Sequence, residues 1–203
     1  MASLTVYSTN GDFISSDSAV YATARAGTGT LSVSSPNSNI IIGQAIAGTY
    51  FCYESFLDFD TSSLGASASI SAAVLDLYFW NDTSITNFTI TVAVSAWGAT
   101  LESADFIAGA DLAALTTTNT LSTSGLALGA YTTITDVALA TNINKTTNTR
   151  LLIYSSRHSG NNTPTNNEYV YAYGSADAPR KPRLTITYTA GAAAPTQTHQ
   201  MML

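Results

Sequence analysis

The chain has 203 residues, only 10% of them charged, and a formal net charge of −6. This length suits a single domain, and so few charges disfavour long surface helices. The net negative charge and the lack of a dense basic run argue against nucleic-acid binding. The sequence contains no run of about 18 apolar residues, so we predict no membrane-spanning helix.

Period-two alternation recurs along the chain and predicts strands. In residues 72–80 it places Leu75, Leu77 and Phe79 on one face, and β-branched and aromatic residues are frequent in all the candidate segments. In chain order the predicted strands are NIIIG (39–43), FLDFD (56–60), AAVLDLYFW (72–80), FTITVAV (88–94), RLLIYS (150–155), EYVYAYG (168–174) and RLTITYT (183–189).

Helical patterns are short. Residues 103–116 predict one or two turns with Ser103 as N-cap and with Phe106, Ile107 and Leu112 inward. A second short helix is predicted to open at Asp136. Many strands and few helices indicate an all-β fold, an antiparallel β-sandwich of jelly-roll type.

The strand pattern stops after Thr189. We therefore predict one β-sandwich domain over residues 1–189. Residues 190–203, AGAAAPTQTHQMML, are predicted to form an extended C-terminal tail that contacts another subunit.

Charge is distributed unevenly. Up to residue 144 there is one base against eleven acids, and from residue 145 to 183 there are six bases against two acids. Such a chain can pair its own strands, or it can pair with copies of itself.

The segment FLDFDTSSL carries Asp58 and Asp60, two carboxylates at a strand spacing of about 7 Å. Glycoside hydrolysis uses paired carboxylates at about this separation. An Asp at a strand end also accepts hydrogen bonds from the following backbone amides in an Asx-turn, and we favour this structural turn for Asp60. A structural calcium ion held by Asp12, Asp17 or Asp58 is a further alternative; no other cofactor is predicted.

Other reactive side chains are few. His158 and His199 are the two histidines, which is too few for a structural zinc site. No G-x-S-x-G motif supports a Ser–His–Asp triad through His158, so we predict a solvated loop histidine. Cys52, the single cysteine, is predicted to be a small buried residue.

Tyr169, Tyr171 and Tyr173 share one face of a predicted strand. Exposed, together with Trp97, they would form a sugar-stacking platform or a protein-binding surface. Buried, they would be part of the core, and we favour burial. Trp80 and Trp97 are predicted to close the core at strand ends.

Three segments occur in a familiar order: ESFLDFDTSSLGASASISAAVLDLYFW, the Ala96–Gly98 segment, and APRKPRLTITYT. Together they resemble the DNRLRE-type β-sandwich family, a jelly roll similar to carbohydrate-binding modules. Residues 142–177 are similar to a subset found in tailed phages and prophages. The sequence departs from the family pattern at Gly65, where proline is usual.

The resemblance implies a non-enzymatic module. We expect a structural protein of a tailed-phage virion, a capsid decoration or cement protein or a head or tail fibre protein, on the virion surface. Its partners would be copies of itself, with a trimer as one candidate state, and major capsid or tail proteins. The alternative is a carbohydrate-binding module that adheres to host surface glycans. The start of the chain has no secretory signal pattern, so synthesis in the host cytoplasm is expected.

Overall fold

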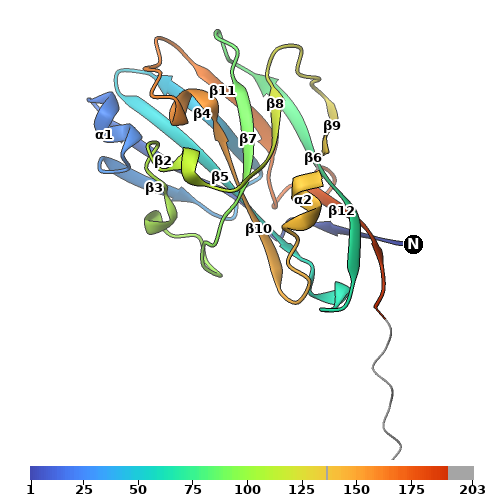
Figure 1. Ribbon diagram of the computed structural model, residues 1–203. Helices are drawn as coiled ribbons and strands as arrows, with labels where there is room; N and C mark the ends of the chain where they lie inside the picture. The colour runs from blue at the N-terminus through green and yellow to red at the C-terminus, as the bar shows by residue number, and fades with distance from the viewer. Residues whose placement is uncertain (136, 192–203) are drawn as a thin grey trace, which may run out of the picture.

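The computed structural model describes residues 1–135 and 137–191 as a predominantly antiparallel β-structure with short helices (Figure 1). The predicted all-β sandwich is therefore confirmed. The strands are β1 (Ala2–Tyr7), β2 (Asn10–Ser18), β3 (Thr30–Ser34), β4 (Asn39–Ile46), β5 (Tyr50–Asp60), β6 (Ser69–Asp82), β7 (Thr89–Val94), β8 (Thr117–Ser122), β9 (Ala130–Thr135), β10 (Asn148–Ser155), β11 (Glu168–Tyr173) and β12 (Arg183–Thr189).

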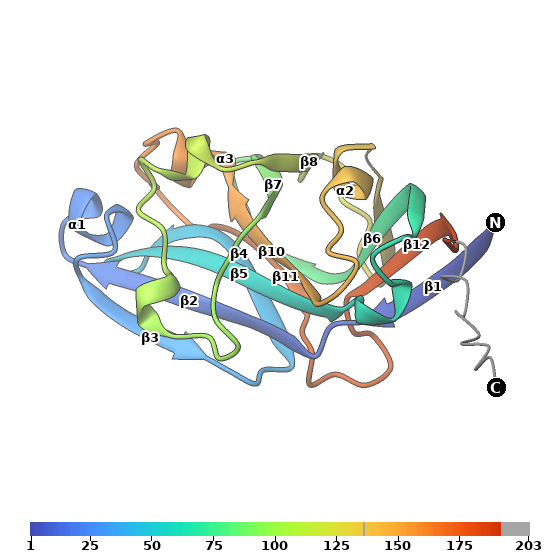
Figure 2. The same cartoon turned by 60° about the horizontal axis from the view of Figure 1, so that its bottom comes forward.

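The strands form one curled sheet in the order β1-β12-β6-β11-β4-β5-β10-β7-β8. Strand β2 pairs with the edge of β5 that does not contact β4 and β10, and it also pairs with β3. Strand β9 pairs with β6. The curl packs β7 and β10 against β6, β11 and β12 across one core. Figure 2 shows an upper layer with β7 and β8 and a lower layer with β2, β4 and β5. Every described strand pair is antiparallel, which suits the alternation seen in the sequence.

The main core lies between these layers. Leu75, Leu77 and Phe79 of β6 are fully buried in it, on the face that the sequence predicted. Leu57 and Phe59 of β5 enter the same core. Burial of such side chains contributes about 1.5–3 kcal/mol each and makes this core the main source of stability.

A second cluster covers the opposite face of β5 and β10, where Phe56 and Leu152 are fully buried. The segment between β7 and β8 lies over it and contains two 3-10 turns, η2 (Ser103–Asp105) and η3 (Leu112–Ala114). The predicted N-cap was wrong by one residue, because Glu102 and Asp105 form the capping box.

The described residues also form three short helices: α1 (Tyr21–Arg25), α2 (Val137–Thr141) and α3 (Ser156–Ser159). A 3-10 turn, η1 (Ser62–Leu64), follows β5. The predicted helix start at Asp136, and the predicted tail beyond Gly191, lie outside the described residues.

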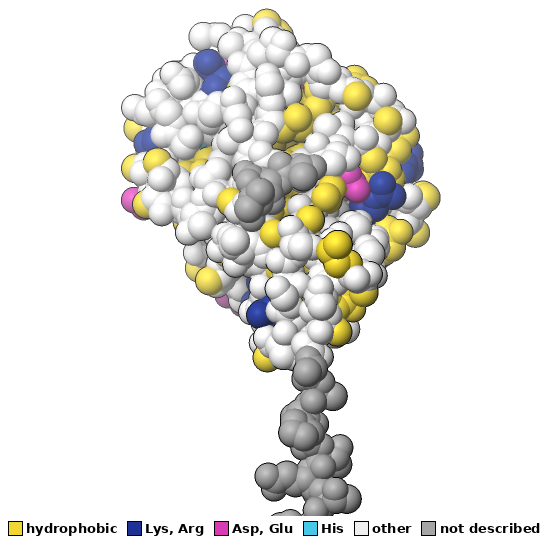
Figure 3. Space-filling view, turned by 45° about the vertical axis from the view of Figure 1, so that its right-hand side comes forward, with side chains coloured by type: hydrophobic (Ala, Val, Ile, Leu, Met, Phe, Trp, Pro, Cys, Tyr) yellow, Lys and Arg dark blue, Asp and Glu magenta, His cyan; other side chains and the backbone are white. Residues whose placement is uncertain are grey.

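The uneven charge of the sequence is partly balanced within the fold. Arg150 lies 3.5 Å from Asp58, and Arg183 lies 2.8 Å from Asp76, so bases late in the chain pair with acids early in the chain. Figure 3 shows a face on which a few charged side chains are scattered among hydrophobic side chains and uncharged surface.

Candidate functional site

Nine aromatic rings form a continuous row on the sheet surface, which we name the outer aromatic row. Along β11 its tyrosines are half-buried and alternate with fully buried core residues, so they lie on the face opposite the core. Neighbouring ring centroids are 4.9 to 6.2 Å apart, and Phe13 and Phe51 are both neighbours of Tyr53. The row consists of Phe13, Phe51, Tyr53, Tyr169, Tyr171, Trp80, Tyr173, Tyr78 and Tyr131.

The sequence pattern placed three members of this row, Tyr169, Tyr171 and Tyr173, on one strand face, and we predicted that this face is buried. Trp80 was expected to close the core, and it is 38% exposed, with its Nε1 donating to Asn39 Oδ1 at 3.0 Å. Both expectations were wrong for the same reason: an aromatic strand face does not reveal which side of the sheet it occupies. Cross-strand register supplies the missing rings, such as Tyr131 opposite Tyr78.

Gly43 allows the row to cross β4. It stands in register with both Tyr53 and Tyr169, whose ring centroids are 5.6 Å apart. Its φ is +139°, and a Cβ placed there would lie 2.1 Å from the carbonyl oxygen of Glu168. A side chain at this position would collide with β11 and separate the two rings.

Two arginines cover one end of the row. The Arg180 guanidinium lies 3.5 Å from the Tyr173 ring centroid, and Asp177 holds it with a 2.7 Å ion pair. Arg183 lies 4.2 Å from the Tyr131 ring centroid. Burial raises the pKa of Tyr53 and of Tyr171, so these hydroxyls stay protonated and uncharged. The surface of the row is thus aromatic and hydroxyl-bearing, with cations at one end.

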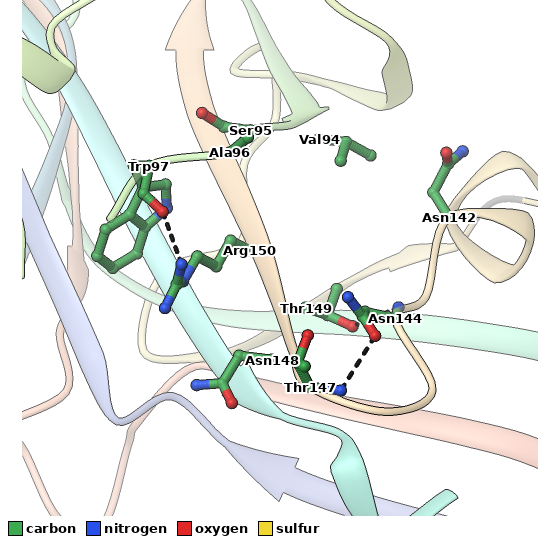
Figure 4. A pocket seen from close by; sticks show the side chains of 10 residues that line it. All are labelled: Val94, Ser95, Ala96, Trp97, Asn142, Asn144, Thr147, Asn148, Thr149 and Arg150. Carbon is green, nitrogen blue, oxygen red and sulfur yellow. Dashed lines mark hydrogen bonds between the residues drawn. The ribbon is translucent and has the colours of Figure 1, made fainter. Parts of the chain in front are cut away.

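Trp97 does not join the row. It is 4% exposed within the second cluster, with Phe56 in a T-shaped contact and Arg150 5.1 Å from its ring centroid. A cavity of about 300 Å³ adjoins it, and the surrounding asparagine and threonine side chains are visible in Figure 4. Arg150 Nη1 donates to the Trp97 carbonyl at 2.7 Å. Since the indole is packed, it offers no open face to a sugar.

The three carboxylates considered for calcium are not all brought together. Asp58 is buried and accepts from Asn148 Nδ2 at 2.8 Å as well as pairing with Arg150. Asp12 is buried on β2, and burial raises its pKa. Asp17 lies an odd number of residues from Asp12 and faces the other side of β2. Within residues 1–135 and 137–191, no three His, Cys, Asp or Glu side chains group to hold a metal ion.

Asp60 has the geometry of an Asx-turn. Its Oδ1 accepts from the Ser62 backbone N–H at 3.0 Å and from the Ser62 hydroxyl at 2.6 Å. These hydrogen bonds lower the pKa of Asp60, because they favour the charged carboxylate. The two carboxylates therefore have different partners: Asp58 pairs with Arg150, whereas Asp60 accepts hydrogen bonds within the turn that follows β5.

A second group of polar side chains lies inside the fold, beneath α1 and α3; we name it the buried polar cluster. Tyr21 contacts the cluster through its hydroxyl, which donates to Gln44 Oε1 at 2.9 Å. Gln44 Nε2 donates to Glu168 Oε2 at 2.8 Å. The cluster consists of Arg25, Gln44, Glu54, Arg157, His158 and Glu168, in which Arg157 and Glu168 form a short ion pair.

His158 is fully buried in this cluster, so the prediction of a solvated histidine was wrong. The turn of α3 directs it inward, and Gly109 makes room, since a Cβ there would lie 2.7 Å from His158 Cδ2. Its Nε2 is 3.3 Å from the Arg25 carbonyl, and its Nδ1 is 3.7 Å from Glu54 Oε1.

Burial sets the protonation of this pair. Desolvation raises the pKa of Glu54 well above its ordinary value and lowers the pKa of His158 to about 4. In the tautomer that donates from Nε2 to the Arg25 carbonyl, the neutral His158 turns its Nδ1 lone pair towards Glu54, whose raised pKa favours the protonated carboxyl. Cys52 is also buried, and desolvation raises its pKa to about 12, so it is not a thiolate nucleophile.

No helix among the described residues has the length and apolar character needed to cross a membrane.

No family model matches the chain, and no significant match exists among curated proteins. The resemblance to DNRLRE-type sandwiches stays a prediction.

Proposed function

We propose that this chain is a non-enzymatic structural protein of a tailed-phage virion, which decorates or cements the capsid surface or belongs to a head or tail fibre. The observation that carries the proposal is the outer aromatic row. Tyrosine, tryptophan and arginine are the residues enriched in the energetically dominant parts of protein interfaces. A half-exposed row of nine rings on a sheet face suits contact with another protein.

The titratable side chains support a non-enzymatic role. Asp58 is neutralised by Arg150, and Asp60 caps a turn. His158 and Glu54 are both fully buried and face each other, out of reach of a substrate. These groups act within the fold, and the aromatic row is left as the surface that meets a partner.

The partners that we propose are copies of the chain itself, with a trimer as one candidate state, and major capsid or tail proteins. Virion location is tested by labelling particles released from a strain that carries the gene, with antibodies raised against the purified protein. We expect labelling of heads or tails at regular positions. Unlabelled particles, with the protein present elsewhere in the lysate, would contradict the proposal.

A second candidate function is adhesion to host surface glycans. It is favoured by the uncapped part of the row, where Tyr169, Tyr171 and Trp80 are consecutive at 5.3 and 4.9 Å. Aromatic rings present apolar faces with polar tips, which suits stacking against sugar rings. A glycan array, probed with and without calcium, tests this function.

Variants sharpen the glycan experiment. Trp80→Ala should abolish binding to the array, whereas Trp97→Phe, in the buried cluster beside the 300 Å³ cavity, should retain it. Loss of binding only in the Trp97 variant would move the sugar site from the row to that cavity.

A further inference from the structure

A surface cavity of about 360 Å³ lies at the end of the outer aromatic row, between the end of β1, β9 and the turn that precedes β12. We infer that this cavity binds a carboxylate side chain of an acidic segment of a neighbouring protein. The inference rests on the proposed assembly role and names the chemistry of the partner. The cavity is lined by Tyr7, Tyr131, Ala178, Pro179, Lys181 and Arg183.

Two cations face this cavity in a chain whose net charge is −6. Lys181 forms no ion pair with any residue in the described ranges. Arg183 uses Nε to donate to Asp76 Oδ2 at 2.8 Å, and its two terminal NH2 groups have no hydrogen-bond acceptor within the described chain. An anion entering the cavity would meet an unpaired ammonium and free guanidinium donors, which suit a carboxylate.

The negative charge next to Arg183 is already engaged. Asp76 is 5% exposed, and its second oxygen accepts from Thr133 Oγ1 at 2.6 Å. Counting Lys181 and Arg183 against Asp76, the cavity carries a net charge of about +1 at neutral pH. Its walls are held in place, since the Tyr131 hydroxyl donates to the Lys181 carbonyl at 3.1 Å.

The geometry favours a protein carboxylate over a stacked sugar. One side of the Tyr131 ring is covered by Arg183, with 4.2 Å between guanidinium and centroid, and Tyr78 makes a T-shaped contact at 5.2 Å. Little of the ring is left for a pyranose to stack on. Tyr7, 51% exposed, is the open wall against which the stem of a glutamate would pack.

A second cavity offers a matched control. It has nearly the same volume, about 370 Å³, and also contains a lysine, Lys145. However, Lys145 Nζ donates to the Ala68 carbonyl at 3.0 Å, and no arginine or aromatic ring lines the cavity. Charge reversal at Lys145 changes the net charge of the protein as much as charge reversal at Lys181 does, but it leaves the proposed site untouched.

The test is titration of the full chain with a synthetic hexaglutamate peptide by isothermal calorimetry, at low and high salt. We expect binding that Lys181→Glu weakens at least tenfold, that Tyr7→Ala weakens less, and that Lys145→Glu leaves within twofold. Binding should weaken in 0.5 M salt, because the contact is partly exposed. Circular dichroism checks that each variant is folded.

Absence of hexaglutamate binding, or equal loss in the Lys181 and Lys145 variants, would overturn the inference. Tighter binding of a hexauronate oligosaccharide than of the peptide would overturn it as well, and would assign the cavity to an acidic sugar. If particles are labelled but the peptide does not bind, the virion role stands and this inference fails. If the peptide binds but particles are unlabelled, the site stands without that role.

Discussion

The outer aromatic row and the buried polar cluster occupy opposite faces of the same two strands. On β5, Tyr53 belongs to the row and its neighbour Glu54 to the cluster; on β11, Tyr169 and Glu168 repeat this arrangement. The apolar rings lie outside and the titratable groups lie inside, the reverse of the usual distribution. This local inversion is what the proposed contact surface requires of the exposed rings, and it leaves the buried acids and histidine in contact with the rest of the fold.

The largest effect is expected in the buried polar cluster. Replacing the fully buried His158 by alanine removes its contact with the Arg25 carbonyl and leaves a cavity, and Glu54→Ala leaves the Ile107 N–H without its acceptor. Each change should lower the free energy of unfolding by about 3 kcal/mol. Urea denaturation of each variant measures this loss. A loss under about 1 kcal/mol for both would show that the cluster is not structural.

Substitutions at two adjacent residues of β11, Val170 and Tyr171, compare the stability contributed by the inner and outer faces of the sheet. Val170 is fully buried in the core, and Val170→Ala should cost about 2 kcal/mol. Tyr171 is half-buried in the row, and Tyr171→Ala should cost about 1 kcal/mol or less. If both variants lost the same free energy of unfolding in the urea assay, the row would contribute to stability as much as the core does.

The pH dependence of stability tests the protonation of Glu54 and His158. The pKa of Glu54 is raised from 4.5 in the folded protein. Its contribution to the free energy of unfolding is therefore lost as the pH rises towards the folded-state pKa. The pKa of His158 is lowered from 6.5 to about 4, so its contribution is lost as the pH falls through that window. The two effects oppose each other between pH 4.5 and 6.5. The His158 effect ends at about pH 6.5, whereas the Glu54 effect continues up to the raised folded-state pKa of Glu54.

We therefore expect the free energy of unfolding to fall as the pH rises above about 6.5. Glu54→Gln, which cannot ionise, should remove most of this fall. Urea titrations at several values between pH 5.5 and 8.5 provide the measurement. A wild-type profile that is flat in this range, or a Gln variant with the full slope, would show that Glu54 is not protonated in the folded protein.

The smallest effect is expected at the corner after β5. Asp60→Ala removes the two hydrogen bonds to Ser62 and should lower the melting temperature slightly, whereas Asp60→Asn, which keeps an acceptor oxygen, should lower it less. Thermal scans of the two variants provide the comparison. If the melting temperature were unchanged and binding of a ligand or metal ion were lost, Asp60 would belong to a binding site and not to a structural turn.

Much of the fold could be predicted from alternation, because a two-layered sheet buries alternate residues. The pattern of residues 72–80 places Leu75, Leu77 and Phe79 on one face, and all three are fully buried in the core. Strands β1, β2, β3, β8 and β9 were not predicted. In β2, for example, Asp12 and Ser16 stand on the same buried face as Ile14, so the apolar alternation is interrupted.

The candidate site was harder to predict, because it depends on contacts between distant segments. Tyr53 and Tyr169 meet across Gly43, and Tyr131 reaches the row only through its pairing with β6. His158 is buried through contacts with Arg25 and Gly109, neither of which is near it in sequence. Local patterns indicate which residues share a face, but the curl of the sheet decides which face meets solvent.

The central claim is that the outer aromatic row is a contact surface between protein subunits. The most direct test is the solution mass by light scattering of the wild type, of the double variant Trp80→Ala with Tyr171→Ala, and of the control Val20→Ala, an exposed residue outside the row. We predict a mass that is a multiple of 21.2 kDa for the wild type and the control, and 21.2 kDa for the double variant. A wild type that stays at 21.2 kDa at all concentrations, or a double variant that assembles as the wild type does, would contradict the claim.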